Sequence, residues 1–180
     1  MVYIILGKGF EPMEAIAPCD ILRRGGAEVR FAGIGGTLIE GGHGISVQAD
    51  CTVEQMKLAE ADMVILPGGL GGVHSILASE TAMNFIRLAY EKNCSVAAIC
   101  AAPTILARLH ITDGRKATCY PGMEDQMGTA QMIPCGAVQD GNVITGRAAG
   151  SADEFGLACL RALKGEDTAR QVASDIVYRA

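Results

Sequence analysis

The sequence is poor in aromatic residues and has no run of positive charge. It contains no tryptophan, four phenylalanines and four tyrosines, and its formal net charge at pH 7 is −5. Nucleic acids and anionic membranes are usually bound through clustered lysines and arginines, so we expect neither as a main partner. This composition favours small molecules or other proteins as partners.

Long hydrophobic runs and paired cysteines are also missing. The N-terminal segment MVYIILGKGF has no basic residue before its short apolar run, and no apolar stretch of about 18 residues follows. The seven cysteines form no C-x-x-C pair and no zinc-type spacing with the three histidines. We therefore expect no signal peptide, transmembrane helix, disulfide framework or metal site, and we expect a cytosolic protein with reduced thiols.

What the sequence does contain is a regular alternation of apolar and amphipathic segments. It has 180 residues, of which 49% are hydrophobic, and this length and composition predict one domain over residues 1–180 with an aliphatic core. Apolar runs at 2–6, 63–66 and 95–99 are typical of buried strands, and helical patterns cover 12–24, 79–93 and 103–109. Such alternation predicts an α/β fold, a doubly wound and mainly parallel sheet with helices on both faces.

Shorter motifs predict the remaining elements. A strand at 28–34 precedes a hairpin, TLIE and ISVQAD, around the turn GGHG. Thr52 and Gln55 form a capping-box pattern that predicts a short helix over 52–61, and Ser79 is the expected cap of the helix that follows it. A strand pair with an Asp-Gly turn at 140–141 precedes two closing helices.

Three loops with chemically useful residues follow predicted parallel strands. They are GKGFEPME after 2–6, PGGLGGVHS after 63–66, and the corner at Cys100 after 95–99. Ligands of open parallel sheets bind outside the carboxyl ends of the strands. We therefore expect an acid, a glycine loop and a thiol to share one cleft.

Cys100 lies between a predicted strand and a predicted helix, in VAAICAAPTIL. A nucleophile elbow needs small residues two positions on either side, and Ala98 and Ala102 satisfy this need, although the usual glycines are missing. A helix N-terminus favours thiolate, which predicts a lowered pKa for Cys100. The alternative is a buried cysteine that acts as a small hydrophobic residue, and this is our interpretation of the other six.

The acid and the glycine loop each allow two interpretations. Glu11 and Glu14 lie one helical turn apart, where acids complement the helix dipole, but one carboxyl could instead exchange a proton with the cysteine. The segment LPGGLGG could be a plain turn or could place N–H groups around a developing oxyanion. It lacks the P-loop ending, and Pro12 interrupts a dinucleotide fingerprint, so nucleotide binding is not expected.

The three histidines do not complete a cysteine–histidine hydrolase site. His110 ends a predicted helix, His43 lies in a hairpin turn and His74 follows the glycine loop. These are typical positions for surface or capping residues. Because no imidazole is placed beside the thiol, the sequence predicts no catalytic triad.

Together these features closely resemble the ThiJ/PfpI family, specifically its DJ-one branch of small stress proteins within the class I glutamine amidotransferase-like superfamily. The resemblance runs through the whole chain in PMEAIAPCDILRRGG, VILPGG, AAICAAPTIL and TGRAAGSADEFGLA. It implies a flavodoxin-like sandwich and a homodimer, with Cys100 as an oxidisable nucleophile and Glu14 as its protonated hydrogen-bonding partner. It also implies that Gly69 and Ala101 are backbone donors near the sulfur.

The sequence departs from the family pattern at three positions. Tyr120 in ATCYPG replaces the histidine of many relatives, and Ala101 stands where the protease-like branch has a histidine directly after the cysteine. His43 stands where close relatives carry an arginine that reaches toward the cysteine of the other subunit. Histidine-assisted chemistry is therefore not expected within one subunit, while His43 is a candidate contact across the dimer and Tyr120 a secondary site residue.

The resemblance favours a cofactor-independent glyoxalase or deglycase that acts on methylglyoxal, glyoxal or their early adducts. Cys100 would form a hemithioacetal and Glu14 would move the proton between the two carbons. The alternative is a redox-sensing or chaperone-like stress protein whose Cys100 is oxidised to sulfinate and whose partners are proteins. Peptidase and amidotransferase activities are disfavoured because the base is absent.

Overall fold

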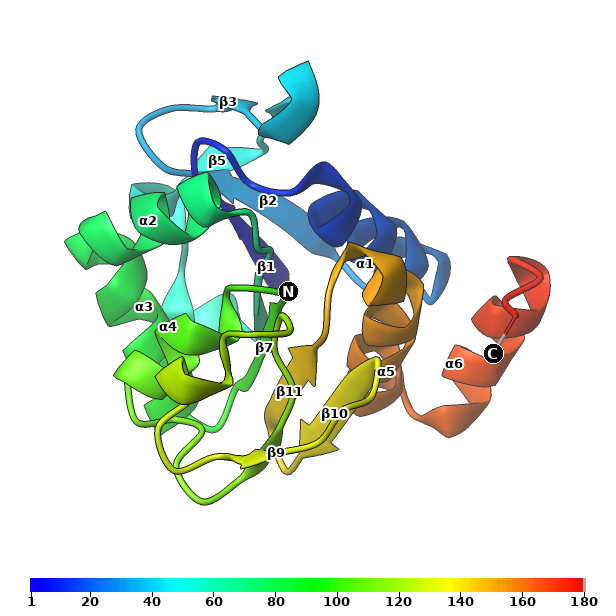
Figure 1. Cartoon of the computed structure of the whole chain (residues 1–180). Helices are drawn as coiled ribbons and strands as arrows, with labels where there is room; N and C mark the ends of the chain where they lie inside the picture. The colour runs from blue at the N-terminus through cyan, green and yellow to red at the C-terminus, as the bar shows by residue number, and fades with distance from the viewer. Residues whose placement is uncertain (180) are drawn as a thin grey trace.

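The computed structural model describes residues 1–179 and builds them around a seven-stranded sheet (Figure 1). Two further sheets have two strands each, β3 with β4 and β8 with β9. The strands are β1 (Val2–Leu6), β2 (Val29–Gly33), β3 (Leu38–Glu40), β4 (Ser46–Gln48), β5 (Cys51–Thr52), β6 (Met63–Leu66), β7 (Ser95–Ile99), β8 (Lys116–Ala117), β9 (Gln131–Met132), β10 (Ala137–Asp140) and β11 (Val143–Gly146).

The main sheet has the order β10-β11-β7-β6-β1-β2-β5. All its pairs are parallel except β10 with β11 at one edge. With the two-residue edge strand β5 set aside, the parallel strands β1, β2, β6, β7 and β11 have the order 2-1-3-4-5, which is that of flavodoxin-like folds. The predicted doubly wound sheet is therefore confirmed, and its switch point lies between β1 and β6.

Helices cover both faces of the sheet, as predicted (Figure 1). One face packs against α1 and α5, with α6 packed on α5, and the other face packs against α2, α3 and α4. The α-helices are α1 (Pro12–Arg24), α2 (Leu70–Ala78), α3 (Glu80–Glu91), α4 (Pro103–Arg108), α5 (Ala152–Lys164) and α6 (Glu166–Asp175). Among residues 1–179, no helix is both long enough and apolar enough to cross a bilayer.

The alternation of side chains along β1 joins the two halves of the core. Val2, Ile4 and Leu6 belong to the cluster under α1 and α5, whereas Tyr3 and Ile5 belong to the cluster under α2, α3 and α4. Successive residues of a strand point to opposite faces, so a strand buried on both faces is apolar throughout. This explains the uninterrupted VYIIL sequence.

Helix α1 is held against α5 by a close approach at Gly156. A Cβ added there would lie 2.9 Å from Ile21 Cδ1 and 3.0 Å from Pro18 Cα. A larger residue would force the helices apart, so glycine is required for this packing. The contact matters for function because α1 carries Glu14.

Several local predictions are confirmed. The GGHG hairpin forms between β3 and β4, which pair in antiparallel fashion. The Ser79 side chain caps α3 by accepting a hydrogen bond from the N–H of Ala82. The Asp-Gly turn joins β10 to β11, with Gly141 at a φ of 62°.

Three local predictions are wrong or incomplete. The helix expected over 52–61 is two separate turns of 3₁₀-helix, Val53–Gln55 and Leu58–Glu60, although the capping box at Thr52 is present. The segment PGGLGGVHS was expected to be a loop, but helix α2 begins within it, at Leu70. The helix expected over 103–109 forms as α4, but Cys100, which was expected at its N-terminus, lies three residues before it, because residues 100–102 form the turn itself.

Candidate active site

The carboxyl ends of β1, β6 and β7 meet at one edge of the sheet, as predicted. The backbone N–H of Glu11, after β1, donates to the Gly68 carbonyl oxygen after β6 at 2.9 Å. The N–H of Cys100, after β7, donates to the Gly146 carbonyl oxygen at 3.0 Å. The first bond fixes the acid-bearing segment to the glycine loop, and the second fixes the thiol corner to the end of β11.

Glu14 lies in the first turn of α1 and is buried, with 1% of its surface exposed. Its Oε2 accepts a hydrogen bond from the Gly68 N–H at 2.8 Å, and Oε1 has no partner in ordinary hydrogen-bond geometry. Burial raises the pKa of the Glu14 carboxyl to about 7, although interactions with the Cys100 thiol and the Gly68 N–H act in the opposite direction. The carboxyl therefore changes protonation near neutral pH.

Glu11, one turn earlier, has a different role. Its side chain caps α1 by accepting a hydrogen bond from the Met13 N–H at 3.4 Å. The helix-capping interpretation therefore fits Glu11, while Glu14 is the acid that faces the thiol.

Cys100 occupies a strained corner. Its φ of 67° lies in the left-handed region that non-glycine residues rarely adopt. Such strain is found at functional sites, and here it turns the chain sharply between β7 and α4. The side chain is partly exposed, so the sulfur is accessible at the carboxyl end of the sheet.

The pKa of Cys100 shifts in the direction opposite to the prediction. Burial and the neighbouring Glu14 carboxylate raise the pKa of the thiol to about 12, and hydrogen bonds from the N–H groups of Gly69 and Ala101 only partly oppose this. The prediction counted the helix N-terminus but not burial, and α4 begins three residues later at Pro103. At neutral pH the resting sulfur is therefore a neutral thiol, and it lies beside a carboxyl that can accept its proton.

The two predicted backbone donors lie near the sulfur. The N–H groups of Gly69 and Ala101 both interact with the Cys100 side chain. Gly69 has a φ of 80°, and a Cβ there would lie 2.5 Å from the Gly9 carbonyl oxygen. Only glycine fits this position, which places its N–H toward the thiol.

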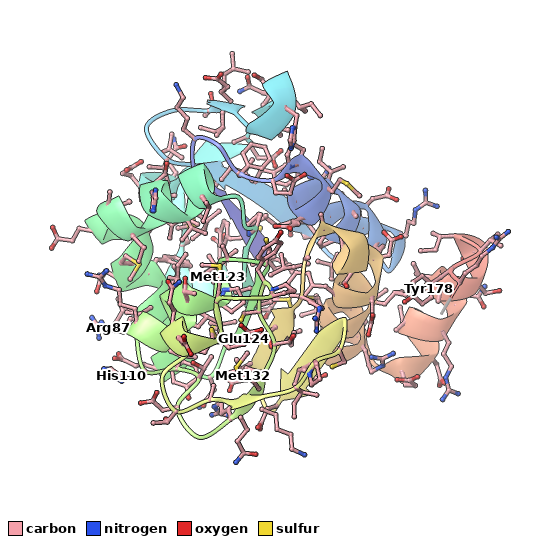
Figure 2. All side chains as sticks on the ribbon, in the orientation of Figure 1. Arg87, His110, Met123, Glu124, Met132 and Tyr178 are labelled. Atoms are coloured by element: carbon pink, nitrogen blue, oxygen red, sulfur yellow. The ribbon has the colours of Figure 1, made fainter. Side chains whose placement is uncertain are left out.

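A cavity of about 510 Å³ opens in front of Cys100. Part of its wall comes from the segment between β8 and β9, which packs against α4 and carries the labelled residues Met123 and Glu124, while the labelled Met132 lies in β9 itself (Figure 2). The Tyr120 N–H donates to the Cys100 carbonyl oxygen at 2.8 Å, so this segment is fixed to the elbow. The cavity is lined by Gly69, Leu70, Cys100, Ala101, Tyr120, Pro121 and Met123.

Several of these residues were not anticipated. Gly68 was seen only as part of a glycine loop, although its N–H holds Glu14. Pro121 and Met123 had no local signal, because their role depends on a cavity formed by distant segments. Leu70 lies in the LPGGLGG motif, which was considered only for its backbone N–H groups.

The histidines do not approach Cys100 within the chain. His43 is 79% exposed and its Nε2 lies 3.6 Å from Glu11 Oε2, in a left-handed turn between β3 and β4. His110 pairs with Asp113 at 2.9 Å, and His74 is exposed on α2. Within one chain, therefore, the structure brings together Cys100 and Glu14 but no imidazole.

The other cysteines are free thiols at separate positions. Burial raises the pKa of most of these thiols. For Cys19 and for Cys119 the pKa is about 11. Within residues 1–179, no three histidine, cysteine or acidic side chains form a group that could hold a metal ion.

Comparisons with known proteins agree with this architecture. The chain is 35% identical over 177 residues to Protein dj-1beta of Drosophila melanogaster, covering 97% of this chain and 95% of that protein. It is 34% identical over 148 residues to a deglycase of Pyrococcus horikoshii, covering 81% and 89% of the two chains. The crystal structure of Drosophila DJ-1beta matches with a TM-score of 0.92 and 33% identity, over 99% of this chain and 98% of that one.

A second structure and a family model extend the comparison. The structure of oxidized DJ-1 from Toxoplasma gondii matches with a TM-score of 0.94 and 26% identity, over 99% of this chain and 98% of that one. The model of the DJ-1/PfpI family matches residues 1–162. This chain, with its flavodoxin-like fold and its thiol elbow facing a buried acid, therefore belongs to the DJ-1/PfpI family.

Proposed function

We propose that this protein is a cofactor-independent glyoxalase or deglycase-like enzyme that acts on small vicinal dicarbonyls or their early adducts. The observation that carries the proposal is the pairing of Cys100 with the buried Glu14, whose pKa is raised to about 7. A group that must both accept and release a proton works best when its pKa lies near the working pH. The deglycase of P. horikoshii supports the same class of activity.

In the first step, the Cys100 sulfur attacks the aldehyde carbon of the substrate. The thiol proton passes to the Glu14 carboxylate, and the carbonyl electron pair moves onto oxygen. The N–H groups of Gly69 and Ala101 stabilise this developing oxyanion. Protonation of the oxygen by Glu14 gives a neutral hemithioacetal and restores the carboxylate.

In the second step, Glu14 removes the proton from the former aldehyde carbon and leaves an enediolate with its negative charge on the former ketone oxygen. Glu14 returns this proton to the adjacent carbon, the hydroxyl proton of the hemithioacetal moves to the former ketone oxygen, and the product is a thioester of a hydroxy acid. The aldehyde carbon is oxidised and the ketone carbon is reduced, so the electrons balance within the substrate. Water then hydrolyses the thioester, which releases the hydroxy acid and regenerates the thiol.

The raised pKa of Cys100 fits this sequence of steps. A thiol whose pKa is about 12 is neutral at rest and becomes nucleophilic only when its proton is transferred to Glu14. The site thus activates its nucleophile through a neighbouring base instead of storing a stable thiolate.

Lactate formation from methylglyoxal tests the proposal. We expect the purified chain, without added thiol, to convert methylglyoxal to lactate, and Cys100→Ser to abolish this conversion. Absence of lactate from the wild-type protein would contradict an enzymatic role.

A redox response is the second candidate function. Two N–H groups and a protonatable carboxyl surround the Cys100 sulfur, and the same groups would bind the oxygens of a sulfinate. The oxidized Toxoplasma protein is a structural neighbour that supports this candidate. Mass spectrometry after peroxide treatment tests it: sulfinate at Cys100 with negligible turnover supports a sensor, and an unmodified Cys100 contradicts it.

We also propose that the protein is a homodimer. Met13, Ile16 and Ile45 are exposed by 57%, 44% and 47%, and they line one groove beside α1. Covering these side chains with a second copy would remove apolar surface from water. Light scattering should give twice the chain mass of 18.8 kDa, whereas a monomer would remove His43 from any role across an interface.

A cytosolic location is part of the same proposal. All seven cysteines are free thiols, which supports a reducing compartment. Fractionation of cells with an antibody against the chain tests the location: recovery with cytosolic markers supports it, and recovery with an organelle contradicts it.

A further inference from the structure

The cavity at Cys100 has an apolar wall. Leu70 and Tyr120 are large side chains with apolar surface, and such side chains are usually buried. Here they are 62% and 49% exposed. Together with Pro121 and Met123, they surround the cavity mouth. Exposed apolar surface is stabilised when a ligand with apolar surface covers it.

The cavity lining contains no positive charge. Within residues 1–179, none of the lining residues is Lys, Arg or His, and the charged group that acts on the Cys100 thiol is the Glu14 carboxylate. Arg147 influences the neighbouring Cys119 but does not line the cavity. A second carboxylate in this space would be repelled by Glu14 and would find no cation to pair with among the lining residues of the chain.

The cavity is also larger than the smallest dicarbonyls require. Its volume of about 510 Å³ falls in the range of about 300–1,000 Å³ that holds ligands of drug size. Glyoxal or methylglyoxal would leave most of the apolar wall uncovered. A substrate with a larger apolar substituent would cover Leu70, Tyr120 and Met123 while its aldehyde carbon reached Cys100.

We propose that this cavity selects vicinal dicarbonyls with an uncharged, apolar substituent, up to the size of an aromatic ring, and excludes those that carry a carboxylate. Leu70, Tyr120 and Met123 are then the residues that determine specificity. The inference rests on the proposed function, because it names the substrates of the same Cys100 site.

Two aryl glyoxals of similar shape test the charge preference. We expect phenylglyoxal to be turned over with a kcat/KM at least about tenfold higher than that of 4-carboxyphenylglyoxal. We also expect phenylglyoxal to exceed glyoxal by about tenfold, because the ring buries more apolar surface than a hydrogen atom does. Equal values for the charged and uncharged aryl substrates would overturn the proposal.

Alkylation of Cys100 measures the same preference without turnover. The ratio of the rates for neutral iodoacetamide and anionic iodoacetate is measured for Cys100 and for Cys135, a partly exposed thiol outside the cavity. We expect the ratio at Cys100 to be about fivefold or more above the ratio at Cys135, since Glu14 repels the anion. Equal ratios would contradict an anion-excluding cavity.

A charge introduced at the cavity mouth completes the test. Leu70→Arg should raise the kcat/KM for 4-carboxyphenylglyoxal about tenfold relative to phenylglyoxal. Leu38→Arg adds the same charge at a leucine that is 71% exposed on the β3–β4 hairpin, and it should leave this ratio unchanged. An equal shift in both variants would show that general charge, and not the cavity, sets the preference.

The two proposals fail in different ways. If no dicarbonyl is turned over but Cys100 still prefers iodoacetamide, the enzymatic function is wrong and the selectivity of the cavity stands. If dicarbonyls are turned over without regard to charge and the alkylation ratios are equal, the enzymatic function stands and the selectivity is wrong.

Discussion

The backbone of Gly68 lies between Glu14 and Cys100 and sets the spacing of the two side chains. Its N–H donates to Glu14 Oε2 at 2.8 Å, and a Cβ added to it would lie 2.6 Å from that oxygen and 2.7 Å from Cys100 Cβ. One backbone position therefore touches both partners of the proposed chemistry. The acid and the thiol form one unit whose geometry depends on the absence of a side chain at this glycine.

Gly68→Ala should lower kcat/KM for methylglyoxal by about 100-fold, because displacement of a reacting group by about 1 Å costs this much. Gly150→Ala is the control, since a Cβ there meets nothing within 4 Å, and we expect its activity to stay within about twofold of wild type. Circular dichroism establishes that both variants fold. Wild-type activity in folded Gly68→Ala would mean that the Glu14–Cys100 spacing is unimportant.

The pH dependence of Cys100 alkylation should report the titration of Glu14. The pair loses its first proton near the Glu14 pKa of about 7 and its second near the Cys100 pKa of about 12. The rate of iodoacetamide modification should therefore rise through pH 7 and level off above it. In Glu14→Gln this step should disappear, and a variant that retains it would show that another group controls the thiol.

Burial of Glu14 should make the folded state less stable as the pH rises. Its pKa is about 7 in the folded state against an ordinary value of 4.5, so the unfolded chain releases this proton at lower pH than the folded protein does. This stabilisation, about 3 kcal/mol, is fully present below pH 4.5 and is lost as the pH rises through 7.

Urea denaturation of wild type and Glu14→Gln between pH 4 and pH 8 measures this effect. Glutamine keeps an acceptor for the Gly68 N–H but does not ionise. As the pH rises, the free energy of unfolding of wild type should therefore fall relative to that of the variant. Curves that stay parallel over the whole range would contradict the raised pKa of Glu14.

The elements that the sequence predicted best are those whose periodicity reflects burial. The runs VYIIL and SVAAI became central strands because a strand covered on both faces must be apolar throughout. Helix α2 escaped prediction because Gly71 and Gly72 have low helix propensity. They are glycines because α2 packs on the loop between β1 and α1: a Cβ at Gly72 would lie 2.8 Å from Phe10 Cα.

At the site, the sequence indicated which residues meet but not their electrostatic state. Parallel topology alone placed the loops of Glu14, Gly69 and Cys100 at one edge of the sheet. The raised pKa of Cys100 depends on burial and on the distance to a carboxyl, which no local pattern records. The family resemblance pointed to Tyr120, but the neighbouring wall residues Pro121 and Met123 were hidden, because their place beside Cys100 depends on how the chain folds back and not on a motif.

The turnover of methylglyoxal by Glu14→Gln, compared with Glu11→Gln, tests the central claim most directly. Both changes remove one carboxylate from the N-terminal end of α1. Only Glu14 interacts with the Cys100 thiol, whereas Glu11 caps the helix. We predict that kcat falls by at least about 100-fold in Glu14→Gln, as for a lost general acid or base, and far less in Glu11→Gln. Near-wild-type kcat in Glu14→Gln would contradict the account.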